Sequence, residues 1–223
     1  MKHIASCSFG KDSLATVLLV IENKLPLDEV VFYDTGMEFD EIYQTRDMLL
    51  PILKEHHITY TELKPKRPFI DTMINYPHKA RNGKLKNGYG WCGGLCRWGT
   101  TEKLKALDKY CKGSIQYVGI AFDEKPRLER LHNEKNKLSI LEKLQMTEKQ
   151  CLDYCYSKGF NWNGLYNYLD RVSCWCCRNK NLKELKNYKK YLPIYFERLC
   201  ELEQRIGEPM KKPYYLKERF KDD

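Results

Sequence analysis

The sequence SCSFGKDS, Ser6–Ser13, joins a short apolar segment to an apolar run with helical spacing. The segment His3–Ser8 is predicted to be a buried strand, and Asp12–Asn23 is predicted to be a helix. A glycine and a lysine at such a junction are typical of an anion-binding turn, because the free N–H groups and the positive dipole end of a helix favour an anion. The stretch therefore predicts a first strand and a first helix connected by a phosphate-binding loop.

Strands and helices continue to alternate after this loop. The further predicted strands are Glu29–Asp34, Ile58–Leu63 and Ser114–Phe122. The further predicted helices are Leu95–Tyr110 and Glu38–His57, in which Pro51 should cause a kink or a break. This order implies right-handed crossovers and a doubly wound, mainly parallel α/β sheet. Because ligands of such sheets bind beyond the carboxyl ends of the strands, we expect SFGKDS, DTG and AFDE, which follow three of them, to form one site.

The strand pattern ends near Thr147. After it come an aromatic segment and an amphipathic helical pattern over Asn181–Ile206, which Pro193 interrupts. We therefore expect a nucleotide-binding α/β domain in residues 1–146 and a helical subdomain, with cysteines, in residues 147–223.

Composition limits the class of protein. The 223 residues are 42% hydrophobic and 31% charged, which is typical of a soluble globular protein and not of a disordered one. No apolar stretch approaches the about 20 residues that a membrane span needs. The first strand begins so early that no signal peptide is expected. These features predict a cytoplasmic protein without a membrane partner.

Positive charge is unevenly distributed along the chain. The net charge of +9 favours polyanionic partners. Between Lys79 and Lys105 there are seven basic residues and one acidic residue, Glu102. Residues 79–88 have turn composition, and this segment is either a solvated loop or a phosphate-binding loop.

The ten cysteines are too many to ignore in a reducing compartment, where clustered cysteines indicate metal or redox chemistry. YGWCGGLCRWG contains Cys92 and Cys96, and RVSCWCCRNK contains Cys174, Cys176 and Cys177. Two groups of thiolates suit a tetrahedral zinc ion or a 4Fe-4S cluster, and spacing does not distinguish them. The alternative is that these are core residues, which is our interpretation of the remaining ones, Cys7, Cys111, Cys151, Cys155 and Cys200.

SFGKDS resembles the pyrophosphate-binding loop of the adenine nucleotide alpha-hydrolase superfamily. The resemblance continues, in order, through FYDTGMEFDEIY, VGIAFDEKPRLER and RVSCWCC, and so covers residues 3–177. Together these motifs are similar to the phosphoadenosine phosphosulfate (PAPS) reductase-like branch. The resemblance implies attack on the α phosphorus of ATP with loss of pyrophosphate. Such a reaction needs cationic and N–H stabilisation of the phosphates, usually with magnesium.

The resemblance also implies roles for individual residues. The phosphates of the nucleotide would be bound by Ser8, Phe9, Gly10, Lys11, Asp12 and Ser13. The nucleoside would lie beside Asp34, Thr35 and Gly119. Magnesium or the acceptor would be oriented by Asp123 and Glu124, and phosphate would be bound by Arg127 and Arg130. The segment DEKPRLER also fits a solvated helix start with i,i+3 ion pairs. Catalysis is expected from Lys11, Asp12, Asp123, Glu124 and Arg127.

The cluster-bearing relatives have two adjacent cysteines before a CxxC motif, and they hold a 4Fe-4S cluster. In this chain the two cysteines of the first motif are instead separated by three residues, as CxxxC. The resemblance favours iron-sulfur over zinc, with ligands Cys92, Cys96, Cys174 and Cys177. Cys176 would be a spare cysteine, a substitute ligand or a sulfur carrier. A cluster together with an adenylating loop implies sulfur transfer to a nucleic-acid or nucleotide acceptor. Loop 79–88 would guide this acceptor, and a sulfur-donor protein would supply the sulfur.

Two other functions remain open. Sulfonucleotide (PAPS or APS) reductases usually have altered residues where this chain keeps Lys11-Asp12-Ser13, and they carry a cysteine in a C-terminal Glu-Cys-Gly tail. This chain ends in KPYYLKERFKDD, without a cysteine after Cys200, which disfavours reduction. The other alternative is a non-catalytic nucleotide- or nucleic-acid-binding metal module.

Overall fold

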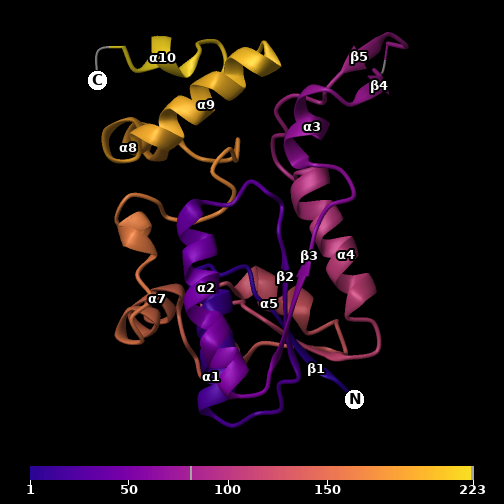
Figure 1. Cartoon of the computed structure of the whole chain (residues 1–223), viewed down its shortest axis with the longest axis vertical. Coiled ribbons are helices and arrows are strands. Elements are labelled where there is room, and N and C mark those ends of the chain that lie inside the picture. The colour runs from indigo at the N-terminus through magenta and orange to yellow at the C-terminus, as the bar shows by residue number, and fades with distance from the viewer. Residues whose placement is uncertain (81, 222–223) are drawn as a thin grey trace. The chain divides into compact units, whose positions relative to one another are not determined.

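The computed structural model describes residues 1–80 and 82–221, without the side chains of Arg97 and Trp98. The chain forms two compact units (Figure 1). Unit 1 consists of Met1–Asp34, Phe39–Lys64 and Leu104–Gly164, and unit 2 consists of Thr35–Glu38, Pro65–Lys103 and the chain from Leu165. Within the described residues, no helix combines the length and the apolar character that crossing a membrane requires.

Unit 1 contains a parallel five-stranded sheet in the order β3-β2-β1-β6-β7. Its strands are β1 (His3–Ser6), β2 (Glu29–Tyr33), β3 (Thr59–Leu63), β6 (Ile115–Val118) and β7 (Lys137–Leu138). Ala5 of β1 pairs with Val30 on one side and with Tyr117 on the other. The predicted parallel α/β sheet is confirmed, although β7, with two residues, is too short to be predicted from periodicity.

Helices lie on both faces of this sheet. They are α1 (Lys11–Glu22), α2 (Asp40–Glu55), α4 (Glu102–Tyr110), α5 (Lys125–Leu131), α6 (Ile140–Lys143) and α7 (Glu148–Ser157). Figure 1 shows α4 on one side of the strands and α1 and α2 on the other. On the α4 side, Leu107 packs in a buried cluster with Ile4 and Val31. α2 continues through Pro51 as one helix, with Leu49 and Leu53 fully buried around it.

The strand order reverses at β1, which has β2 on one side and β6 on the other. This reversal is the topological switch point at which doubly wound sheets bind ligands. The loop after β1 leads into α1, and the segment after β6 leads into α5. Two of the three polar motifs therefore flank the position where a ligand is expected.

Unit 2 is mainly helical. Its elements are α3 (Phe69–Ile74), β4 (Pro77–Lys79), β5 (Leu85–Asn87), the π-helix η1 (Arg97–Thr101), α8 (Leu182–Tyr191), α9 (Pro193–Ile206) and α10 (Leu216–Arg219). The 3₁₀ segment η2 (Trp162–Asn167) leads from unit 1 into unit 2 along the chain. Pro193 separates α8 from α9 as predicted, and it occupies the first turn of α9, where its missing N–H costs nothing.

Two predictions for unit 2 need correction. The segment interpreted as a loop contains an antiparallel hairpin, β4–β5, in which His78 pairs with Lys86. Strands of three residues with polar side chains lack the alternation by which strands are recognised. The helix predicted from Leu95 begins at Arg97, with a π-helical turn before α4.

Candidate functional site

The phosphate loop of unit 1 is fixed at Phe9. This residue has a positive φ of 58°, is fully buried and packs edge-on against Phe32, with ring centroids 5.0 Å apart. The indole N–H of Trp162 donates a hydrogen bond of 2.7 Å to the Phe9 carbonyl. A bulky residue at positive φ needs such support, because the conformation is strained. Burial makes the Phe9 ring an anchor that shapes the loop, and nucleotide binding at Phe9 stays a prediction.

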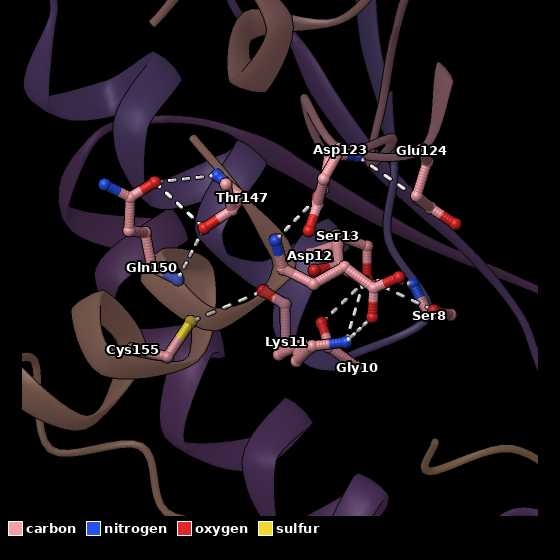
Figure 2. Close-up of polar contacts among 12 residues, drawn as sticks. Ser8, Gly10, Lys11, Asp12, Ser13, Asp123, Glu124, Thr147, Gln150 and Cys155 are labelled. Carbon is pink, nitrogen blue, oxygen red and sulfur yellow. Dashed lines mark hydrogen bonds and ion pairs between the residues drawn. The ribbon is translucent and has the colours of Figure 1, made fainter. Parts of the chain in front are cut away.

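Two serines close the loop (Figure 2). The Ser13 hydroxyl donates to the Gly10 carbonyl at 3.1 Å and accepts the Ser8 backbone N–H at 3.1 Å. The two serine hydroxyls are also 3.1 Å apart. Gly10 is the N-cap of α1 and has no side chain that could bond the first turn. The N–H groups at the start of α1 are therefore arranged as in sites that bind anions.

Lys11 is 6% exposed and lies between two carboxylates. Its Nζ donates to Glu148 at 2.6 Å and to Asp12 at 3.3 Å. Burial lowers the pKa of Lys11, but the charges and hydrogen bonds of Asp12 and Glu148 outweigh it, and the pKa is raised overall. The site thus holds a charged ammonium group out of water.

Glu148 was missed in the sequence. The capping box formed by Thr147 and Gln150 marks the start of α7 (Figure 2). The Asp123 carboxylate accepts the Glu148 N–H at 3.0 Å. The capping pattern predicts a helix start at this position. It does not predict contact with Lys11, which is 137 residues away in the sequence.

Asp12, the carboxylate of the phosphate loop, has a raised pKa. Burial raises its pKa from 3.8 to about 6, Lys11 opposes this shift, and Glu148 and Glu124 add to it. Its Oδ1 atom is buried and has no hydrogen-bond partner among the residues that the structure describes. A bound cation or a donor group would satisfy this atom, and such perturbed groups are concentrated at functional sites.

Gly119 brings the end of β6 against the start of α1. A Cβ atom at this position would lie 2.6 Å from the Ser13 nitrogen and 2.7 Å from the Ser13 Cα. Both atoms belong to the backbone of α1, so a side chain at this position would displace the first turn of the helix. The prediction that Gly119 lies beside the nucleoside stays a prediction, but this close approach is itself a reason for glycine.

The motif after β6 forms mainly local contacts. Arg127 donates to both oxygens of Glu124, at 2.5 and 2.6 Å, and Glu124 also accepts the Ala121 N–H at 3.2 Å. This is the i,i+3 ion pair that the sequence allowed. Arg130 is exposed in the last turn of α5. Of this motif, Asp123 is connected to the phosphate loop, through Glu148 and Lys11.

The DTG motif is divided between the units. Asp34 follows β2 in unit 1 and accepts a hydrogen bond of 2.7 Å from the Tyr43 hydroxyl. Thr35 belongs to unit 2, where its hydroxyl donates to Glu38 at 3.0 Å and lies 3.6 Å from the Cys174 sulfur. Thr35 is therefore a neighbour of the second cysteine motif, a contact that the sequence did not suggest.

Both cysteine motifs lie in unit 2, and the side-chain amide of Asn179 connects the second motif to the backbone of the first. Asn179 donates to the Gly94 carbonyl at 2.8 Å and accepts the Gly94 N–H at 3.0 Å. In the second motif, the Cys177 N–H bonds the Cys174 carbonyl at 3.1 Å, which makes Cys174–Cys177 a tight turn. The two motifs predicted to act together are thus held in one unit.

The thiols of these motifs are close enough to influence one another. Burial raises the pKa of Cys176, and the charges of Cys174, Cys177 and Cys96 raise it further. Burial also raises the pKa of Cys96, whereas the Gly99 N–H, which donates to its sulfur at 3.3 Å, lowers it. Metal binding would therefore have to displace protons from these thiols.

Soft thiolates are the donors that zinc and iron-sulfur clusters take, so the donor chemistry fits the predicted cofactor. Within residues 1–80 and 82–221, however, no three Cys, His, Asp or Glu side chains are arranged to hold a metal ion. Lys180, which is 3% exposed, adds a nearby cation that the sequence did not reveal. Burial lowers its pKa, and the charges of Glu184 and of the second cysteine motif oppose that shift.

Gly119→Ala tests the contact between β6 and α1. We expect the free energy of unfolding to fall by about 1–3 kcal/mol, as in overpacked cores, because the first turn of α1 must move. Hydrogen exchange of the Leu14 amide, which bonds the Gly10 carbonyl at 3.0 Å, should also accelerate. Gly113→Ala is the control: Gly113 has a φ of +81° with open space around it, so this change strains its own turn only. Unchanged exchange in α1 of the Gly119→Ala protein would contradict the contact.

The raised pKa of Asp12 predicts a pH-dependent stability. Between pH 3.8 and about 6 the unfolded chain has lost this proton while the folded chain keeps it. The folded state then binds more protons, so this group lowers the free energy of unfolding as the pH rises, by at most about 3 kcal/mol. Asp12→Asn removes this contribution.

Urea unfolding of both proteins across this pH range checks the sign. Relative to the unaltered protein, Asp12→Asn should become more stable with rising pH and level off above about pH 6. Asp153→Asn, in an exposed i,i+4 pair with Lys149, is the control and should show no such gain. A stability difference that is constant from pH 4 to 7 would refute the buried carboxylate.

Comparison with known proteins places this sequence in a family. Residues 2–180 match the phosphoadenosine phosphosulfate reductase domain. Uncharacterized protein MJ0066 of Methanocaldococcus jannaschii is 26% identical over 200 residues, which cover 86% of this chain and 39% of that protein. Uncharacterized protein MJ0973 of the same organism is 25% identical over 213 residues, which cover 91% of this chain and 47% of that protein.

This chain spans less than half the length of these curated relatives. The matched domain, however, runs from β1 through both cysteine motifs, and so includes the phosphate loop and every residue of the predicted sites. The chain belongs to the phosphoadenosine phosphosulfate reductase domain family, within the adenine nucleotide alpha-hydrolase superfamily.

Proposed function

We propose that unit 1 binds ATP with magnesium and promotes attack on its α phosphorus, so that pyrophosphate leaves. Family membership supports a function related to adenine nucleotides. The observation that carries the finer proposal is the buried Lys11 beside the N-terminus of α1, with Asp12 next to it. An ammonium group at an uncapped helix start is suited to a phosphate chain, because the charge and the dipole act on the same anion.

The contacts of Lys11 suggest how its charge is balanced when no nucleotide is bound. Glu148 and Asp12 neutralise the ammonium group that phosphate oxygens would otherwise bind. A triphosphate would take over this charge, and the released carboxylates would face its magnesium ion. Magnesium prefers carboxylate and phosphate oxygens, and the buried Oδ1 of Asp12 fits that preference. The protein would contribute orientation and charge, as is usual in phosphoryl and adenylyl transfer.

Lys11→Ala is the first test of this proposal. We expect the rate of pyrophosphate release from ATP to fall roughly 100-fold or more, which is the usual effect of removing one group that stabilises transition-state charge. The rate is measured with magnesium and with candidate nucleotide and nucleic-acid acceptors. Lys149→Ala is the matched control, because Lys149 lies next to Glu148 in α7 but is largely exposed and paired with Asp153.

Other products would point elsewhere. Orthophosphate as the only product would refute cleavage at the α phosphorus. Thioredoxin-dependent sulfite formation from PAPS or APS would instead favour the reductase alternative. Nucleotide binding without turnover, with all acceptors present, would favour a non-catalytic binding module.

We further propose that unit 2 holds a 4Fe-4S cluster through Cys92, Cys96, Cys174 and Cys177. Support comes from the cysteine-only donor set and from the reciprocal Asn179–Gly94 hydrogen bonds that connect the two motifs. Lys180 and Lys103, whose charges act on thiols of the second motif, would offset the negative charge of a thiolate-bound cluster. Bound there, a cluster would supply sulfur or electron chemistry.

The complete proposal is sulfur transfer to an activated acceptor. An acceptor oxygen attacks the α phosphorus, the bond between the α and β phosphates breaks, and pyrophosphate leaves. Hydrosulfide released by a donor protein then attacks the adenylated carbon. The new C–S bond forms as the C–O bond to AMP breaks, AMP leaves, and no oxidant or reductant is needed. The basic hairpin β4–β5 suits a nucleic-acid or nucleotide acceptor.

Iron content tests the ligand set. Protein purified without oxygen should contain iron and acid-labile sulfide and show broad visible absorption that fades in air. Serine at any one of the four proposed ligands should reduce the iron content, because the hydroxyl is a poor replacement for a thiolate. Cys200→Ser is the matched control, since Cys200 is buried in α9 of the same unit. Cys151→Ser, in unit 1, should also retain iron.

Zinc is the competing result. A colourless protein with one zinc ion per chain, after purification without oxygen, would refute the iron-sulfur assignment. A cluster that survives loss of Cys92 or Cys96 would refute the choice of ligands and would favour Cys176.

A further inference from the structure

The hairpin β4–β5 carries a row of stacked rings. The guanidinium of Arg67 lies 4.1 Å above the ring of Tyr76. Tyr76 stacks on Tyr89 with ring centroids 5.7 Å apart and an interplanar angle of 16°, and Tyr89 stacks on His78 at 4.1 Å and 19°. We call Arg67, Tyr76, Tyr89 and His78 the ladder. Tyr89 is 41% exposed, so the ladder is not part of a buried hydrophobic core.

The ladder reaches a cavity of about 560 Å³ in unit 2. His78 and Tyr89 line it from the hairpin, and the ends of α3 and α9 form the rest of its wall. Small-molecule sites usually have volumes of about 300–1,000 Å³, so this cavity is large enough for a nucleotide. A ligand ring that enters it meets the ladder at its His78–Tyr89 end.

The cavity wall is rigid at Gly88, between the hairpin and α3. A Cβ atom there would lie 2.3 Å from the Met73 carbonyl oxygen, so the backbones are in direct contact. The N–H of Gly90 bonds the same carbonyl at 2.9 Å, and the Tyr89 N–H bonds the Thr72 carbonyl at 3.1 Å. These bonds satisfy carbonyls at the end of α3 and hold Tyr89 in place. A ligand would therefore meet a preformed stacking surface.

The charge of the cavity favours an anion. Lys79, Lys86 and Arg205 line it, against one carboxylate, Glu208. Glu208 also pairs with Lys212 at 3.4 Å, which offsets its charge. The lining therefore combines aromatic faces with cations, which is the combination found where proteins bind single-stranded nucleic acids.

We propose that this cavity binds an unpaired nucleotide of a single-stranded nucleic acid. The base extends the ladder at its His78–Tyr89 end, and the flanking phosphates contact Lys79, Lys86 and Arg205. This proposal specifies the nucleic-acid acceptor of the proposed function. It rests on that function only for the reaction that the bound strand would undergo. A single strand is favoured over a duplex because a base can stack on the ladder only when it is not already stacked inside a helix.

Oligonucleotide binding tests this inference without any ATP. The probe is a dye-labelled single strand of about 12 nucleotides, within the range that such sites cover, as RNA and as DNA. Fluorescence anisotropy should detect binding that weakens with salt. Tyr89→Leu removes the ring on which His78 stacks but keeps an apolar side chain. The face that His78 offers to the base is then no longer held, and binding should weaken roughly ten-fold or more. Tyr89→Phe should retain the affinity.

The structure offers matched controls. Tyr191→Leu alters another stacked tyrosine of unit 2, which is 42% exposed and stacks on Tyr168 at 4.3 Å. It should bind the probe as the unaltered protein does. Lys86→Ala should weaken binding and reduce the salt slope by about 0.7, the value expected for one lost phosphate contact on a single strand. Lys54→Ala, in the last turn of α2, should change neither.

Three results would overturn the proposal: no binding of either single strand, equal effects of Tyr89→Leu and Tyr191→Leu, or equally tight binding of the same strand after it is annealed to its complement. The Lys11→Ala protein is measured in parallel and should retain its affinity for the probe. Failure of oligonucleotide binding is thereby distinguished from failure of ATP cleavage, since each is measured without the other. Comparison of the RNA and DNA probes identifies the kind of strand.

Discussion

The phosphate loop of unit 1 depends on the ion pair between Lys11 and Glu148. This pair connects the first turn of α1 to the first turn of α7, and Cys155 of α7 reinforces the connection by donating to the Lys11 carbonyl at 3.4 Å. A partly buried pair of this kind adds little net stability, because desolvation of the charges offsets their attraction. Its value is that it holds a charged group in position. The phosphate loop is thus shaped by α7, whose sequence lies far from the loop.

Asp12 shows the cost of this arrangement. Two carboxylates share one ammonium group in a site with little water, and one of them, Asp12, keeps an oxygen without a partner among the described residues. Such an arrangement is unfavourable for the protein by itself and becomes favourable when a cation or a hydrogen-bond donor arrives. We regard the loop as incomplete on its own, which is why we interpret it as a binding site and not as a structural turn.

The sequence predicted the parts of unit 1 that follow from local chemistry. The order of strands and helices gave the parallel sheet, because buried strands and amphipathic helices have distinct periods. It did not predict partners distant in the chain, such as Glu148 for Lys11 or Trp162 for Phe9. Helix capping marked the residues next to Glu148, but a cap determines where a helix begins and not what it packs against.

Unit 2 was harder to predict, because its contacts join segments that look unremarkable in the sequence. The hairpin β4–β5 has turn composition, and its strands are held by the end of α3 and not by alternating side chains. The DTG motif was interpreted as one element, yet its threonine touches Cys174. Thr35 therefore follows directly, along the chain, from the end of β2 in unit 1 and contacts the cysteine motif in unit 2. A movement of this short segment would therefore act both on the end of β2 and on the surroundings of Cys174, because Asp34 and Thr35 join the two covalently.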